Sequence, residues 1–220
     1  MDIERWMERY QAEVLDAFGG RVRYIGLQGS YGRGEATEAS DIDVVLILDT
    51  CTPEDLARYQ AVVRALPAGE RACGFVSGAA EVAAWDRGEL FQFRRDTTDI
   101  WGRLADLIPP EGPRDAGRAL HAGACEAYHL CGHALVHGCD RETLAGAYKA
   151  AVFLLQAKAY LETGHYCRRH CDLGGLLSGA DLELLQTAQA LRAGTCGDPI
   201  EALASRLFCW SRDVLGSARA

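Results

Sequence analysis

The chain has 220 residues, of which 49% are apolar and 25% are charged, with 31 Asp and Glu against 23 Lys and Arg. These proportions are typical of soluble globular proteins and exclude disordered and fibrous classes. No stretch approaches the roughly 18 uninterrupted apolar residues of a membrane-spanning helix, and the first residues carry acids where an export signal has an apolar core. We therefore expect a cytoplasmic protein that has no membrane partner.

The negative charge is concentrated in the first half of the chain. Residues 1–112 hold 20 acids and 12 bases, whereas residues 113–220 hold 11 of each. This surplus disfavours a nucleic-acid groove, which needs clustered Lys and Arg, and it suits metal ions or a cationic small molecule. The nine cysteines contain no CxxC pair, and we expect them to be reduced.

Helical and strand patterns are mixed in the first half. Apolar residues at helical spacing are followed by Gly19, and a second helix is expected to begin at Thr52 with a proline at its first position. A Gly- and Ser-rich connection separates two apolar strands. The expected order is helix 3–18, strand 22–27, loop 28–40, strand 41–49, a helix after Thr52, an apolar stretch at 73–76, a short helix at 79–85 and a strand at LFQFRR, residues 90–95.

A proline-rich break separates this half from a helical second half. The segment IPPEGP contains three prolines in six residues, which places a domain boundary near residue 112. Beyond it, helices are expected at 114–137, 141–163, 180–193 and 199–217. The predicted fold class is α+β, with a mixed sheet flanked by helices in residues 1–112 and an all-α four-helix bundle in residues 113–220.

Two aspartates stand at the start of the second predicted strand. Asp41 and Asp43 are separated by one residue, so their side chains leave the strand on the same face. Carboxylate oxygens are the ligands that magnesium prefers, and two divalent ions activate the attacking oxygen and stabilise the leaving oxygen when a phosphoryl-linked group is transferred. The pattern therefore predicts a site for two Mg²⁺ ions.

The residues that follow the first strand suit a phosphate group. Gly29 lets the backbone approach a phosphate closely, and Ser30 adds a hydroxyl donor. Arg33 lies in the same loop, and its guanidinium can pair with phosphate oxygens through two hydrogen bonds. We expect these residues to bind a triphosphate opposite the two aspartates.

The segment GLQGSYGRGEATEASDIDVVLILD, residues 26–49, resembles the signature of the DNA polymerase beta nucleotidyltransferase superfamily, in which GS is followed about ten residues later by DxD. The resemblance implies Gly29 and Ser30 at the triphosphate, Asp41 and Asp43 at magnesium, and ATP or another nucleoside triphosphate as substrate. In its helix order the whole chain is similar to kanamycin-type and lincosamide-type antibiotic nucleotidyltransferases. Because bundle faces of such relatives form dimers, we expect a homodimer.

The superfamily also supplies a third carboxylate from a later strand. If LFQFRR is a strand whose core side carries Phe91 and Phe93, then Gln92 and Asp96 lie on the other side. Asp96 is therefore our candidate for the third metal ligand and catalytic carboxylate. The alternatives are Glu81, Glu89 and a role for Asp96 as a turn cap.

The helical half offers candidates for substrate contacts. Lys149 and Lys158 are the only lysines, and in similar enzymes a basic residue of the helical domain reaches the triphosphate, a role that Lys149 can take. The alternative for Lys149 is a solvated helix surface.

Histidines recur along the first bundle helix, at His121, His129, His133 and His137. They are expected to line the acceptor pocket, with Glu126, His129 or His133 as general base. The alternatives are ordinary helix packing or a zinc site, for which further ligands are needed.

The sequence favours transfer of a nucleoside monophosphate to a hydroxyl of a small acceptor, with release of pyrophosphate. An aminoglycoside or a lincosamide is a natural acceptor. The alternatives are nucleotidylation of a partner protein and a nucleotide-binding module without activity.

Overall fold

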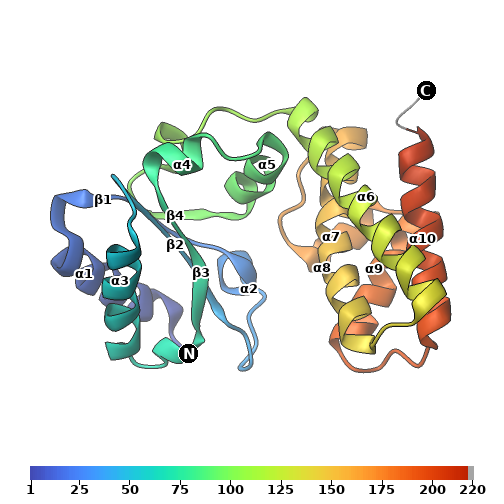
Figure 1. Cartoon of the computed structure of the whole chain (residues 1–220), viewed down its shortest axis with the longest axis horizontal. Helices are drawn as coiled ribbons and strands as arrows, with labels where there is room; N and C mark the ends of the chain where they lie inside the picture. The colour runs from blue at the N-terminus through green and yellow to red at the C-terminus, as the bar shows by residue number, and fades with distance from the viewer. Residues whose placement is uncertain (218–220) are drawn as a thin grey trace. The chain divides into compact units, whose positions relative to one another are not determined.

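The computed structural model describes residues 1–217, which form two compact units (Figure 1). Unit 1 comprises residues 1–86 and 93–110, and unit 2 comprises residues 87–92 and the described residues from 111 onward. The chain therefore passes between the units three times. The sequence predicts one crossing, near residue 112, and the segment 87–92 accounts for the other two.

Unit 1 is built on a four-stranded mixed sheet with the strand order β3-β2-β1-β4. The strands are β1 (Val22–Leu27), β2 (Ile42–Leu48), β3 (Ala72–Gly78) and β4 (Thr98–Trp101). β1 pairs antiparallel with β2 and β4, whereas β2 pairs parallel with β3. The strands predicted at 22–27 and 41–49 are confirmed, and the apolar stretch at 73–76 forms β3.

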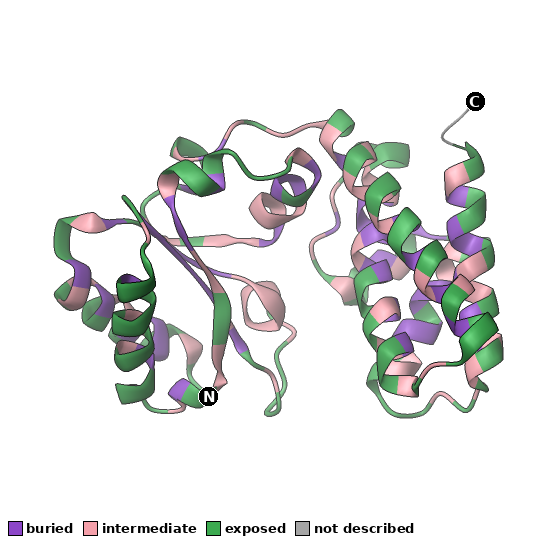
Figure 2. Cartoon of the chain, viewed as in Figure 1, coloured by how far each residue is buried: buried purple, intermediate pink, exposed green. Residues whose placement is uncertain are grey.

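Two amphipathic helices cover one face of this sheet, α1 (Ile3–Phe18) and α3 (Pro53–Ala65) (Figure 1). Asp2 caps the first turn of α1, and Gly19 ends the helix with a positive φ. In Figure 2 the buried positions of α1 and of the central strands are coloured purple. The buried cluster on this face comprises Trp6, Met7, Tyr10, Val14, Phe18, Val22, Ile25, Leu27, Ile42, Val44, Leu46, Leu48, Val63 and Leu66.

Besides α3, three further helices lie between β1 and β4. α2 (Gly29–Arg33) is a short helix within the expected loop, and α4 (Ala79–Ala83) is the short helix predicted after β3. The prediction of a strand at LFQFRR is wrong, because these residues lie in α5 (Arg87–Asp96). Short 3-10 turns occur at Gly19–Arg21, Gly69–Arg71, Leu104–Asp106 and Gly174–Leu176.

Phe91 and Phe93 explain why α5 looks like a strand in the sequence. Phe91 is buried in unit 2, where its ring lies 5.2 Å from that of Tyr160. Phe93 belongs to unit 1, where its ring lies 4.9 Å from that of Phe75. The two aromatic residues therefore serve two different cores and do not mark one face of a strand.

Unit 2 contains the four long helices that the sequence predicts: α6 (Pro113–His137), α7 (Arg141–Thr163), α9 (Gly179–Arg192) and α10 (Ile200–Ser217). A short helix, α8 (His170–Leu173), lies between α7 and α9. Asp140 caps α7 by accepting from Thr143 N at 2.7 Å. No helix of the described residues is both long and apolar enough to span a bilayer.

The core of unit 2 combines small residues on α6 with larger ones from its neighbours. Small side chains let helix backbones approach closely, which increases dispersion contacts. Tyr148 is completely buried and donates its hydroxyl hydrogen to Leu203 O at 3.0 Å, so its polar atom is satisfied within the core. The buried residues of α6 are Ala116, Ala124, Ala127, Cys131 and Ala134.

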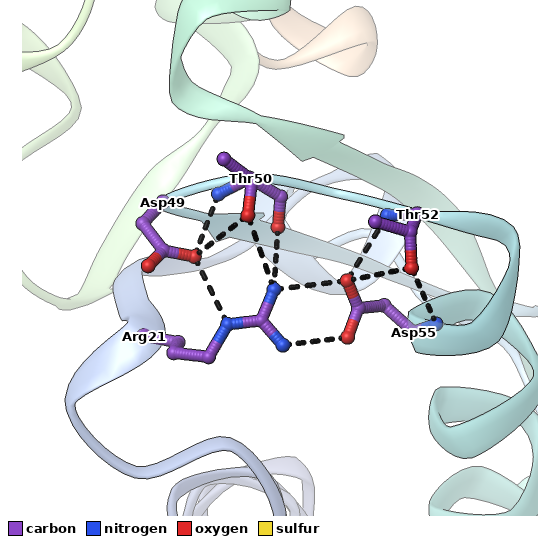
Figure 3. A network of polar contacts seen from close by, with 5 residues as sticks. All are labelled: Arg21, Asp49, Thr50, Thr52 and Asp55. Carbon is purple, nitrogen blue, oxygen red and sulfur yellow. Dashed lines mark hydrogen bonds and ion pairs between the residues drawn. The ribbon is translucent and has the colours of Figure 1, made fainter.

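Arg21 connects the start of β1 to the start of α3 (Figure 3). It donates from Nε to Asp49 at 3.1 Å, from Nη2 to Thr50 O at 3.0 Å, and from both Nη atoms to the carboxylate of Asp55 at 2.6 and 2.9 Å. Asp55 also accepts from Thr52 N, and Thr52 Oγ1 accepts from Asp55 N, which forms a capping box. The Arg21 guanidinium and the Thr52 N–H hold the pKa of Asp55 well below its usual value.

This lowered pKa predicts a defined pH dependence of stability. A carboxyl group whose pKa falls on folding stabilises the fold above its unfolded pKa, near 4, and the contribution is lost as pH falls through the folded value. We expect Asp55→Asn to destabilise the protein at neutral pH and to reduce the loss of unfolding free energy below about pH 5. Urea unfolding at a series of pH values measures both effects. Asp16→Asn, at an exposed position of α1, should follow the wild type, and an Asp55→Asn profile parallel to the wild type would contradict the prediction.

Candidate active site

The GS and DxD motifs lie against each other at one end of the sheet. Gln28 N donates to Asp43 O at 2.7 Å, which extends the pairing of β1 with β2 by one residue. Gly29 then adopts a φ of +64°, and a Cβ atom placed there would lie 1.7 Å from Asp43 Oδ2. The Asp43 carboxylate therefore occupies the space that any larger residue at position 29 would need.

Two polar side chains of the GS and DxD motifs form no hydrogen bond or ion pair with the described residues. Within residues 1–217, neither the Asp41 carboxylate nor the Ser30 hydroxyl makes a hydrogen bond or an ion pair. Asp41 is exposed and Asp43 is half-buried, whereas Ile42 between them is completely buried. The alternation of an extended chain thus places both carboxylates on the face opposite the core contact of Ile42. The site offers hard oxygen ligands beside a hydroxyl donor and a glycine backbone.

The loop between the two motifs is held at both ends by Arg71. Arg71 Nε donates to Ser40 O at 3.2 Å, Nη2 donates to the same carbonyl, and Nη2 donates to the Tyr31 hydroxyl at 3.2 Å. Ser40 directly precedes Asp41, and Tyr31 directly follows Ser30. Arg71 therefore fixes the residue next to each half of the site. Sequence reasoning missed it, because only its position beside a strand is visible in the sequence.

The Gln28 side chain connects the GS motif to the end of α5. Its Nε2 donates to Thr97 Oγ1 at 2.6 Å and to Phe93 O at 3.2 Å. These bonds join the residue before Gly29 to the C-terminal end of α5. The backbone of the GS motif is therefore anchored both to β2 and to α5.

Arg33 forms an ion pair inside the loop. Its Nε lies 3.0 Å from Glu35 Oε2, and the two side chains are 7% and 10% exposed. This contact stabilises the turn after α2. Triphosphate binding by Arg33 remains a prediction.

Two comparisons with known proteins identify the family. Residues 8–111 match the family described as Nucleotidyltransferase domain. The chain is 32% identical over 78 residues to a curated protein of Methanocaldococcus jannaschii, for which protein adenylyltransferase is the proposed name. The match covers 32% of this chain and 77% of the relative. This chain belongs to the nucleotidyltransferase family. It is accordingly a nucleotidyltransferase enzyme, and the matched residues include the GS and DxD pair described above.

A solved structure extends the likeness to the whole chain. The spectinomycin adenyltransferase of Enterococcus faecialis, solved with ATP and spectinomycin, superposes with a TM-score of 0.55 at 12% identity. The match covers 95% of this chain and 99% of the other. At this identity the likeness is one of fold, and it agrees with the predicted α+β class.

β3, the neighbour of β2, offers no acid as the expected third carboxylate. Cys73 stands opposite Asp43 in the parallel register and shares its face, and β3 carries no acid. β4 carries Asp99, which accepts from the Tyr24 hydroxyl at 2.7 Å. The strand geometry that selected Asp96 is wrong, because Asp96 ends α5 and is buried. Its role as a metal ligand and catalytic carboxylate remains a prediction without that support.

The alternatives to Asp96 are exposed. Glu81 lies on α4 in unit 1, and Glu89 lies on α5 in unit 2. Within residues 1–217 no three His, Cys, Asp or Glu side chains gather into a metal-binding cluster. Asp41 and Asp43 therefore form no such cluster with a third acid, and the histidines of α6 form none either.

The candidates of the helical unit lie on its surface. Lys149 is exposed on α7, and Glu126 and His129 are exposed on α6. Lys158, in contrast, is paired with Asp181 at 2.5 Å and with Glu162. Contacts of Lys149 with the triphosphate and of Glu126 with the acceptor remain predictions.

The close approach of the Asp43 carboxylate to Gly29 predicts how a methyl group added at position 29 would affect substrate binding. Gly29→Ala should weaken binding of magnesium-ATP at least about tenfold, because the new Cβ displaces the Asp43 carboxylate. Gly34→Ala is a matched control, since Gly34 also has a positive φ, +72°, but has open space at the Cβ position. Both variants should lose about 1 kcal/mol of stability through backbone strain. Calorimetric titration and thermal unfolding separate the two effects, and equal ATP binding by both variants would contradict the prediction.

Proposed function

We propose that this nucleotidyltransferase transfers a nucleoside monophosphate from a magnesium-bound nucleoside triphosphate, with ATP as the expected donor, to a hydroxyl group of a small acceptor. An aminoglycoside or lincosamide antibiotic is the expected acceptor. The observation that carries the proposal is the contact of the Asp43 carboxylate with the Gly29 backbone, beside Asp41 and Ser30.

The residues present fit magnesium. Asp41 and Asp43 supply hard oxygen ligands from one side of an extended segment, and the Asp41 carboxylate has no internal partner among residues 1–217. These two residues would hold the metal, and Asp96, the third ligand predicted from the sequence, does not gather with them into a cluster among residues 1–217. When bound, magnesium neutralises negative charge on the phosphates and makes the acceptor hydroxyl easier to deprotonate.

The chain's own residues would orient the reacting groups. The backbone at Gly29 and the hydroxyl of Ser30 bind the triphosphate, assisted by Arg33 and, from the helical unit, Lys149. Arg71 keeps the loop between the motifs in one conformation, which reduces the entropy lost when the substrate binds.

The reaction exchanges one phosphorus–oxygen bond for another. The acceptor oxygen forms a bond to the α-phosphorus, and the bond from that phosphorus to the pyrophosphate oxygen breaks. Glu126 is the proposed general base for the hydroxyl proton, with His129 and His133 as alternatives. Pyrophosphate leaves with the electron pair of the broken bond.

Two observations support a small, cationic acceptor. The spectinomycin adenyltransferase, which was solved with ATP and spectinomycin, shares the fold over 95% of this chain. The first 112 residues hold 20 acids against 12 bases, a surplus that attracts a polycation such as an aminoglycoside.

One observation favours a protein as acceptor instead. The Methanocaldococcus jannaschii relative carries the name of a protein adenylyltransferase. Its match with this chain extends over 78 residues, far fewer than the two units together. The identity of the labelled product distinguishes the two acceptor classes.

The test is an acceptor screen with purified protein. Magnesium and each α-labelled nucleoside triphosphate are combined with aminoglycosides, lincosamides or a cell lysate, and pyrophosphate and labelled products are measured. We expect ATP to label a small molecule, and we expect Asp41→Asn and Asp43→Asn each to reduce the rate at least about a hundredfold by removing metal-ligand charge.

The matched control is Asp16→Asn, which makes the same change at an exposed position of α1. It should retain the wild-type rate. A labelled protein band that requires Asp41 and Asp43 would replace the small acceptor with a protein acceptor. Turnover that survives both substitutions would overturn the assigned site.

A further inference from the structure

Phe75, Trp85 and Phe93 form an aromatic cluster in unit 1. The Phe75 ring on β3 lies 5.3 Å from the Trp85 ring and 4.9 Å from the Phe93 ring, measured between centroids, and both pairs are edge-to-face. Such a pair is favourable because the positive edge of one ring meets the negative face of the other, and it covers one face of only one ring. Since the three side chains are half-buried or exposed, the cluster retains ring surface for a further flat group.

The aromatic cluster lies on the same face of the sheet as Asp43. In β2, Ile42 and Val44 pack in the core under α1 and α3, so Asp43 and Val45 point to the opposite face. Phe75 is the register partner of Val45 on the parallel strand β3 and shares its face. A strand spacing of about 4.8 Å and a rise of about 3.3 Å per residue place the Phe75 backbone roughly 8 Å from that of Asp43. The cluster is therefore a near neighbour of the proposed metal site.

Phe93 connects the aromatic cluster to the GS motif. Its carbonyl oxygen accepts from Gln28 Nε2 at 3.2 Å and also from the Thr97 hydroxyl. Gln28 immediately precedes Gly29, whose backbone is proposed to approach the triphosphate. The cluster is thus anchored beside both halves of the candidate active site, and every residue of this arrangement belongs to unit 1.

Trp85 differs from the tryptophans that build the cores. Trp6 and Trp210 are 6% and 5% exposed. Their indole N–H groups donate to Pro67 O and to Asp181 Oδ1, each at 2.7 Å. Trp85 is 45% exposed, and within residues 1–217 its indole N–H makes no hydrogen bond. Single exposed apolar residues are common, whereas a group of adjacent exposed rings marks a binding surface.

We propose that the aromatic cluster stacks on the nucleobase of the nucleoside triphosphate, with Trp85 as the main contact. This inference rests on the proposed function, because it takes the GS motif to bind the outer phosphates and the metal at the DxD motif to bind the α-phosphate. The nucleoside is attached to the α-phosphate, at the end of the triphosphate away from the GS motif. The GS motif follows β1, the DxD motif begins β2, and β3 is the next strand of the sheet. A nucleotide that crosses these strands in order brings its base to Phe75 on β3.

Stacking suits a nucleobase better than the expected acceptor. Every nucleobase has a flat π-face, and stacking on an aromatic side chain tolerates different bases because it does not depend on a hydrogen-bond pattern. The rings of an aminoglycoside are saturated and carry hydroxyl and cationic groups. The cluster should therefore strengthen the binding of the nucleoside and add nothing to the affinity for the phosphates themselves.

The first experiment titrates the full-length protein with magnesium-ATP and with magnesium tripolyphosphate, which lacks the nucleoside, in the absence of an acceptor. Trp85→Leu should weaken ATP binding at least about fivefold, the lower end of the effect of removing one stacked ring. It should leave tripolyphosphate binding unchanged. Trp85→Phe retains an aromatic face and should lose less ATP affinity than Trp85→Leu. Calorimetry measures each affinity.

The matched control is Leu56→Ala, because Leu56 has the same exposed fraction as Trp85, 45%, on α3, which covers the other face of the sheet. It should bind both ligands as the wild type does. Equal weakening of ATP and tripolyphosphate by Trp85→Leu would show that the ring supports the phosphate site, and would overturn nucleobase stacking. Equal losses in Trp85→Phe and Trp85→Leu would overturn it as well. Unchanged ATP binding in Trp85→Leu, with a higher KM for the acceptor, would assign the rings to the acceptor instead.

A failure of the proposed function gives a different result. Wild-type protein that binds neither ATP nor tripolyphosphate with magnesium would contradict the candidate active site, and the inference with it. If Asp43→Asn weakens the binding of both ligands and Trp85→Leu weakens neither, the candidate active site stands and the role of the aromatic cluster is overturned.

A measurement on the wild type makes the test independent of how the variants fold. The photolabel 2-azido-ATP carries its reactive group on the nucleobase, and peptide mass spectrometry locates the labelled residues. With magnesium present, light should attach the label within residues 75–93, which contain the aromatic cluster. Excess tripolyphosphate should prevent labelling by occupying the phosphate site. Label found only outside residues 75–93, or label that tripolyphosphate does not prevent, would contradict the proposal.

Discussion

The contact between the Asp43 carboxylate and the backbone of Gly29 is the constraint on which the site depends. A side chain at position 29 cannot share this space with Oδ2, so the two motifs meet only if the residue is glycine. The contact also requires a particular register of β1 on β2, because Gln28 N bonds to Asp43 O. A register shift of one residue would turn Asp43 toward the core that Ile42 occupies. The hydrophobic alternation of β2 therefore helps to position a polar site.

The anchoring of the surrounding loop follows from the same requirement. A connection of thirteen residues rich in Gly and Ser gains little from burial, so its conformation must be fixed by hydrogen bonds. Arg71 supplies these bonds at Tyr31 and Ser40, and Gln28 supplies them toward Thr97. The side chains with proposed roles, Ser30, Asp41 and Asp43, are exposed or half-buried, while residues adjacent to them carry the structural contacts. This division of roles lets the site be both ordered and open to substrate.

Local signals account for what the sequence predicts correctly. Asp2, Thr52 and Asp140 cap helices through bonds to residues three positions away. The GS motif follows the end of β1 and the DxD motif stands at the start of β2, with a short connection between them. Elements that form only through pairing with distant segments cannot be predicted from local sequence patterns. β4 has only four residues and is defined by its pairing with β1, far earlier in the chain.

The error at LFQFRR has the same physical origin. Its alternation of aromatic and polar residues is typical of a strand with one buried face, but Phe91 and Phe93 pack into different units. The prediction of Asp96 as third ligand depends on a strand with Phe91 and Phe93 on one buried face. Because no such strand exists, this prediction loses its basis. The strand that lies beside Asp43 carries Cys73, a position that no local pattern connects with the site.

The path of residues 87–92 also determines how the enzyme can be divided. A fragment that ends at residue 112 would retain Phe91 without Ala116, Ala157 and Tyr160, the residues that bury it. The complementary fragment would lose both this ring and the Arg87 partner of Asp115. Each fragment would carry an exposed aromatic surface or an unfilled cavity, so neither fragment retains a complete core. An exchange of helical units between related enzymes would have to transfer two separate stretches of chain together.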